Sequence, residues 1–140
     1  MPNKSRLSAS VDVAIQFYHL DPMEIVWHGN YPRFLEKARC ALLDKIGYNY
    51  EEMRASGYAW PIVDMRIKYV KSVSFKQIIT ITAELVEYEN RMVIDYKISD
   101  RENGEILTKA QTKMVALDII KNEMQFESPR IFVDKVEALL

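Results

Sequence analysis

Residues 31–46 constrain the fold of this chain more than any other segment. Asn30 and Pro32 favour the start of a helix there, and Gly47 favours its end. Apolar residues recur at helical spacing and form a broad stripe: Phe34, Leu35, Ala38, Ala41, Leu42 and Ile46, widened by Cys40 and Leu43. A helix with so wide an apolar face needs cover on more than one side. A sheet that curls around the helix would provide that cover.

Segments of alternating apolar and polar residues lie on both sides of this helix and predict strands. They cover residues 11–18, 63–69, 79–85, 92–98 and about 105–119. Asn103-Gly104 predicts a hairpin between the last two strands. Short helices are predicted from a capping box at Asn49 to about Gly57, and from Ser128-Pro129 to Leu140. This order predicts one α+β domain, residues 1–140, in which an antiparallel sheet of five to six strands wraps around one long central helix.

Charge and composition exclude several classes of partner. The 140 residues carry a net charge of −1, so there is no broad basic field for nucleic acid. No apolar run approaches the ~20 residues that span a bilayer, and the first ten residues lack the apolar core of a secretory signal. The single cysteine, Cys40, fits a reducing compartment, so we expect a cytoplasmic protein with no membrane partner. Long edge strands favour a homodimer, and a tetramer formed from two dimers stays open.

The segment between the first strand and the long helix, residues 21–32, contains the candidate chemistry. It reads Asp-Pro-Met-Glu-Ile-Val-Trp-His-Gly-Asn-Tyr-Pro. A carboxylate just before a helix start can attack a carbonyl or activate water, while free backbone N–H groups hold the oxyanion that develops. Composition alone equally allows Asp21 to be a turn residue, because Asp-Pro is a common turn sequence. The spacing of His19, Asp21 and His28 matches no standard metal site, so we expect no metal.

Three stretches give the chain a family resemblance: residues 17–22, residues 25–31 and residues 34–39. They contain an aspartate, a Val-Trp-His-Gly-Asn-Tyr run and a Phe-Leu-Glu-Lys-Ala-Arg helix segment. This pattern resembles the hotdog-fold acyl-CoA thioesterases of the 4-hydroxybenzoyl-CoA thioesterase-like family. Ile67-Lys68-Tyr69 falls where that family has a strand ending in tyrosine. The resemblance covers nearly the whole chain and implies a hotdog fold.

The resemblance also implies catalytic roles. In such proteins an aspartate acts on the thioester as nucleophile or as general base for water, and that role falls to Asp21. A backbone N–H at the helix start polarises the thioester carbonyl, which corresponds to His28 and Gly29. The His28 ring is left open between acid–base work and positioning. Glu36 is the backup catalytic carboxylate; its alternative is a salt bridge with Arg39 or Arg33 at helical spacing.

The same resemblance implies a substrate site at the dimer interface. The residues expected to bind substrate are Trp27, Asn30, Tyr31, Trp60 and Tyr69. Trp60 has an equally simple interpretation as a core residue. No cofactor is expected, because a thioester is already an activated acyl donor.

The chain departs from the family after the tyrosine strand. Many relatives have Pro-Ala and later Gly-Asp there, whereas this chain has Ser72-Val73 and Lys76-Gln77. The acyl group, and the choice between coenzyme A and an acyl carrier protein, therefore stay open. The predicted function is hydrolysis of an acyl-CoA or acyl-carrier-protein thioester. The alternatives are a hotdog dehydratase or hydratase, whose His-Phe-Pro-like loop is missing here, and an acyl-binding hotdog protein without turnover.

Overall fold

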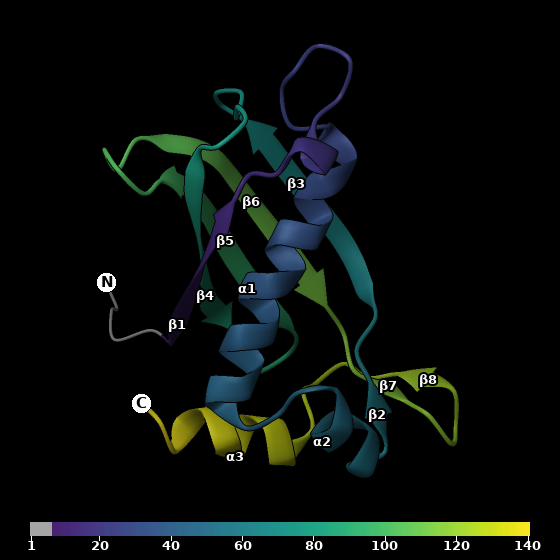
Figure 1. The fold of residues 1–140 in the computed structure, drawn as a ribbon. Helices are drawn as coiled ribbons and strands as arrows, with labels where there is room; N and C mark the ends of the chain where they lie inside the picture. The colour runs from purple at the N-terminus through teal and green to yellow at the C-terminus, as the bar shows by residue number, and fades with distance from the viewer. Residues whose placement is uncertain (1–6) are drawn as a thin grey trace.

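The computed structural model describes residues 7–140 and contains one large antiparallel sheet with a long helix on its inner face (Figure 1). The sheet has five strands in the order β1-β4-β5-β6-β3. Their bounds are β1 Ser8–Ala14, β3 Ile62–Tyr69, β4 Ile78–Glu87, β5 Met92–Asp100 and β6 Ile106–Met114. The α+β arrangement predicted from the sequence, with five strands around one long helix, is confirmed.

The long helix, α1 Tyr31–Ile46, supplies the centre of the core. Its buried residues are Tyr31, Phe34, Leu35, Ala38, Leu42, Leu43 and Ile46. They pack against inward-facing residues of the sheet, among them Ile79, Ile81, Ile94 and Ile98. Cys40, by contrast, is exposed, so the apolar stripe is narrower on that side than the sequence predicts. Gly47 ends the helix with φ at 81°, a conformation that glycine adopts without steric cost, as predicted.

Smaller elements close the end of the barrel-like sheet near the C-terminus of α1. They are α2 Tyr50–Ala55, α3 Arg130–Glu137 and a second, three-stranded sheet of β2 Tyr58–Ala59, β7 Leu117–Asp118 and β8 Glu123–Met124. The capping box predicted at the start of α2 is confirmed: Asn49 N–H donates to Glu52 Oε1 over 2.8 Å. Rings of Tyr48, Trp60 and Phe132 meet under α1, with the Trp60 and Phe132 centroids 5.1 Å apart.

Three predicted element bounds were wrong. The first strand ends at Ala14, because Gln16 N–H donates to His19 Nδ1 over 2.8 Å and holds residues 17–19 in a 3-10 turn. The single strand predicted over residues 105–119 is two strands, since the chain leaves the large sheet after Met114 and enters the small one. The last helix ends at Glu137 rather than at Leu140.

Across residues 7–140, every helix is too short or too polar to span a bilayer.

Candidate active site

Asp21 lies in a tight turn that fixes its carboxylate. Its backbone N–H donates to Ile25 O, and Glu24 N–H donates back to Asp21 O, both over 2.9 Å. Met23 N–H donates to Asp21 Oδ1 over 2.8 Å, so one carboxylate oxygen is held by the backbone. The turn requires a positive φ of 64° at Glu24. Asp21 is half-buried, and within residues 7–140 its other oxygen, Oδ2, has no hydrogen-bond donor.

The rest of the loop is tied to its neighbours by backbone bonds. Val26 N–H donates to Val73 O, and Trp27 N–H donates to His19 O, each over 2.9 Å. Asn30 occupies the predicted N-cap position of α1, but its side chain does not cap the helix. Instead the buried Asn30 amide donates to His19 O over 2.9 Å. The role of Asn30 is therefore to hold the loop against the helix start.

A 3-10 turn, His28–Asn30, leads into α1. Asn30 N–H donates to Trp27 O, whereas the N–H groups of His28 and Gly29 have no acceptor in the described part of the chain. The Trp27 ring lies directly over Gly29, so a Cβ at that position would come within 2.4 Å of ring carbons. A side chain at this position would therefore displace the indole.

These groups meet at a cavity of about 270 Å³. It is lined by Asp21, Ile25, Val26, His28, Tyr31, Tyr69, Val70, Lys71 and Ser72. Tyr31 and Tyr69 form one wall, with their rings edge to face and centroids 4.8 Å apart. Burial raises the pKa of the Tyr31 hydroxyl, which keeps this wall neutral. Asp21, His28, Tyr31 and Tyr69, all predicted as site residues, do come together.

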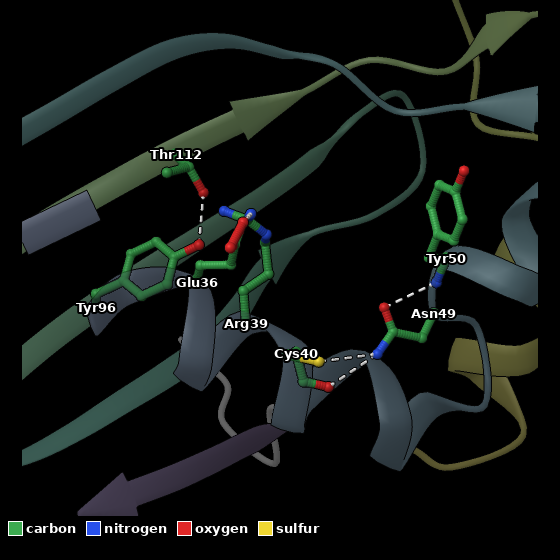
Figure 2. A network of polar contacts seen from close by, with 7 residues as sticks. All are labelled: Glu36, Arg39, Cys40, Asn49, Tyr50, Tyr96 and Thr112. Atoms are coloured by element: carbon green, nitrogen blue, oxygen red, sulfur yellow. Dashed lines mark hydrogen bonds and ion pairs between the residues drawn. The ribbon is translucent and has the colours of Figure 1, made fainter. Parts of the chain in front are cut away.

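Trp60 and Glu36 lie elsewhere, at a second cavity of about 580 Å³. Trp60 is buried and donates from Nε1 to the Tyr48 hydroxyl over 3.2 Å, so its role in the core is confirmed. The Glu36 carboxylate is 68% exposed and contacts Arg39 over 3.5 Å, as in the salt-bridge alternative. Figure 2 shows the Arg39 guanidinium beside the Glu36 carboxylate, and the Arg39 side chain is only 13% exposed.

The walls of this second cavity are largely apolar, and among its lining residues the sequence analysis pointed only to Trp60 and Glu36 as site candidates. Leu43, Met53, Tyr58, Pro61, Met114, Leu117 and Ile119 contribute, drawn from five separate elements or their junctions. The polar residues are Arg54, Tyr50, Asn49 and Cys40 in addition to Glu36 and Arg39. The Asn49 amide donates to Cys40 Sγ over 3.2 Å, as Figure 2 shows. No local motif could reveal a cavity built from residues so far apart in the chain.

A long helix enclosed by an antiparallel sheet is the arrangement of a hotdog protein. The family model described as "Thioesterase-like superfamily" matches residues 15–131, and the chain belongs to that family.

Individual relatives agree with this assignment. YneP of Bacillus subtilis, whose name assigns it provisionally to the acyl-CoA thioesterases, is 28% identical over 108 residues, which are 76% of this chain and 78% of YneP. The structure of a DHNA-CoA thioesterase from Staphylococcus aureus superposes with a TM-score of 0.81 at 26% identity, covering 94% of this chain and 88% of that one. A 4-hydroxybenzoyl-CoA thioesterase with one aspartate replaced by asparagine, complexed with 4-hydroxybenzoyl-CoA, superposes with a TM-score of 0.80 at 22% identity. That match covers 93% of this chain and 99% of the other, and confirms the hotdog fold.

Proposed function

We propose that this protein is an acyl-CoA thioesterase in which Asp21 performs the chemistry. The observation that carries the proposal is the cavity lined by Asp21 and His28 at the start of α1, beside which the backbone N–H groups of His28 and Gly29 have no acceptor among residues 7–140. Family membership and the names of the relatives support thioester hydrolysis. An acyl-carrier-protein substrate and a cytoplasmic location stay predictions.

The arrangement suits attack on a thioester carbonyl. The carbonyl oxygen would sit at the His28 and Gly29 N–H groups, which can stabilise the developing oxyanion by about 3 kcal/mol. As a general base, Asp21 Oδ2 takes a proton from water, and the hydroxide adds to the carbonyl carbon. The tetrahedral intermediate then expels the thiolate, and Asp21 transfers the proton taken from water to the thiolate. As a nucleophile, Asp21 instead attacks the carbonyl carbon, expels the thiolate and forms a mixed anhydride. Water then hydrolyses the anhydride, which frees the acid and restores the Asp21 carboxylate, and the proton released in that step converts the thiolate to the thiol.

The acyl group needs more room than the Asp21 cavity offers. Ligand pockets usually enclose roughly 300–1,000 Å³. The Asp21 cavity, at about 270 Å³, falls below this range, and the second cavity, at about 580 Å³, falls within it. The Asp21 cavity lies at the Tyr69 end of β3, whereas the second cavity contains Trp60 and Pro61 at the opposite end of that strand.

A dimer through β3 would join the two cavities. β3 is an edge strand, and Val63, Met65 and Tyr69 expose apolar surface along it. Antiparallel pairing of two β3 strands about a two-fold axis places the Tyr69 end of one copy beside the Ile62 end of the other. The thioester at Asp21 of one copy would then extend its acyl group into the second cavity of its partner. Glu36 would face that acyl group rather than the thioester.

Thiol release from a panel of acyl-CoA esters tests the proposed chemistry. Asp21→Asn should lower kcat by at least about 10²-fold, because the amide can neither attack nor accept a proton. Glu24→Gln is the matched control, since it removes the other carboxylate of the same turn and should leave the rate near wild type. Equal rates for wild type and Asp21→Asn would overturn the assignment. A wild-type protein that binds acyl chains but releases no thiol would be an acyl-binding module instead.

A further inference from the structure

Three aromatic side chains near the Asp21 loop are exposed to solvent and do not belong to the hydrophobic core. Phe17 is 78% exposed and Tyr18 is 80% exposed, and Phe75 is about half exposed. The rings of Phe17 and Phe75 meet edge to face with centroids 6.1 Å apart, although they come from distant parts of the chain. Exposed aromatic clusters of this kind commonly mark a binding surface.

Positive charges surround these rings. Lys76 Nζ lies 5.8 Å from the centroid of the Phe75 ring. The rings of His19 and Phe34 meet with centroids 5.3 Å apart, so the turn that contains Phe17 lies beside the first turns of α1, which carry Arg33 and Lys37. No ion pair of Lys76, Lys37 or Arg33 occurs within residues 7–140. The rings therefore lie among cations that no carboxylate of the described chain neutralises.

The cluster is attached directly to the Asp21 loop. The bond from Val26 N–H to Val73 O and the bridge between Ile25 and Ser74 join that loop to the segment that carries Phe75. Phe17 precedes Asp21 by four residues, a span of at most roughly 14 Å of extended chain. The arm and pyrophosphate that link the thioester of an acyl-CoA to its adenine are long enough to cover that distance.

We propose that Phe17 and Phe75 stack against the adenine of coenzyme A while Lys76, with Arg33 and Lys37, binds its phosphates. The inference rests on the proposed thioesterase function and selects the carrier of the acyl group. Adenine offers a flat π-face for the rings, and its ribose 3′-phosphate and pyrophosphate offer negative charge. A carrier protein presents phosphopantetheine without adenine, so the rings would have no partner in that complex.

Binding of adenosine 3′,5′-bisphosphate tests the site without any turnover. Titration calorimetry should detect binding to the wild-type protein, and Phe17→Ala should weaken it about tenfold. Phe126→Ala is the matched control, because Phe126 is 96% exposed at a remote position and should have no effect. Lys76→Ala should weaken binding of the bisphosphate more than binding of adenosine, and Lys121→Ala should change neither. Undetectable binding, or equal weakening by Phe126→Ala, would overturn the inference.

Kinetics then separate this inference from the proposed function. The wild-type kcat/KM for an acyl-CoA should exceed that for the same acyl group on pantetheine by at least about tenfold, and Phe17→Ala should remove most of that difference. The rate with acyl-pantetheine should be the same in wild type and Phe17→Ala. Equal kcat/KM values for the two wild-type substrates would overturn the nucleotide site and leave the thioesterase intact. Hydrolysis of neither substrate would refute the thioesterase function, and the bisphosphate titration would still decide the nucleotide site.

Discussion

Hybrid dimers test whether each active site is built from two copies of the chain. Asp21→Asn removes the carboxylate that we propose performs the chemistry, and Cys40→Trp places an indole in the second cavity. Cys40 suits this purpose because its side chain lines that cavity and is exposed, so the larger ring does not enter the core. Each variant should be inactive as a homodimer. The first lacks its base or nucleophile, and the second cannot admit the acyl group.

The expected rate follows from the geometry of the β3 pair. A hybrid dimer contains one site with an intact Asp21 from the Cys40→Trp chain and an open cavity from the Asp21→Asn chain. Its other site combines the asparagine of the Asp21→Asn chain with the blocked cavity of the Cys40→Trp chain. Hybrids isolated with two affinity tags should therefore show about half of the wild-type rate, and a random equal mixture about one quarter.

Thiol release from the acyl-CoA that the wild type prefers is the assay. Cys40→Ser is the control for loss of the thiol itself and should keep full activity. Size-exclusion chromatography and circular dichroism establish that both variants fold and dimerise. An inactive hybrid would refute the two-copy site, because a site contained within one chain cannot be restored by mixing. A fully active Cys40→Trp homodimer would show that the second cavity does not hold the acyl group.

Three further predictions concern the loop and the helix start. Gly29→Ala should cost about 1–3 kcal/mol of unfolding free energy in urea, because its Cβ would overlap the Trp27 ring, and adding Trp27→Ala should recover most of that loss. Asn30→Ala should cost about 0.5–1.5 kcal/mol and lower kcat, because the His19 carbonyl loses one of its two donors; an unchanged urea midpoint would contradict this. Because burial and two nearby cations lower the pKa of His19, the unfolded chain binds its proton first, so unfolding free energy should fall as the pH drops below about 6.5. His19→Gln should flatten that decline between pH 7.5 and 5; an equal decline in both proteins would assign it to other groups.

Local signals explain which elements the sequence predicts well. Gly47 ends α1, the Asn49 capping box begins α2, and Gly104 lies with φ at 75° between β5 and β6. Each depends on the conformation of a few neighbouring residues. The break after Met114 depends instead on the pairing of β7 with β2, residues almost 60 positions apart, which overrides a continuous alternating pattern.

The candidate site shows the same division between local and long-range information. Asp21, His28 and Gly29 fall within one short segment of the chain, so a motif can identify them together. Trp60 and Glu36, which were also site candidates, line the other cavity. If two copies pair through β3, those two residues would face the substrate of the partner's site. Residues from separate parts of the sequence carry no information that assigns them to one chain or the other.

We propose that the Asp21 loop performs the chemistry and that the second cavity binds the acyl group. This division predicts how the specificity for acyl chains can change. The turn that holds Asp21 depends on backbone bonds within residues 19–30 and to Val73. The walls of the second cavity come instead from the middle of α1, from α2 and from the small sheet. Substitutions such as Met53→Ala in α2 can therefore enlarge the acyl pocket without touching a bond that positions the carboxylate. On this scheme such variants shift kcat/KM among acyl chains, while kcat for a short acyl group that never reaches the second cavity stays constant.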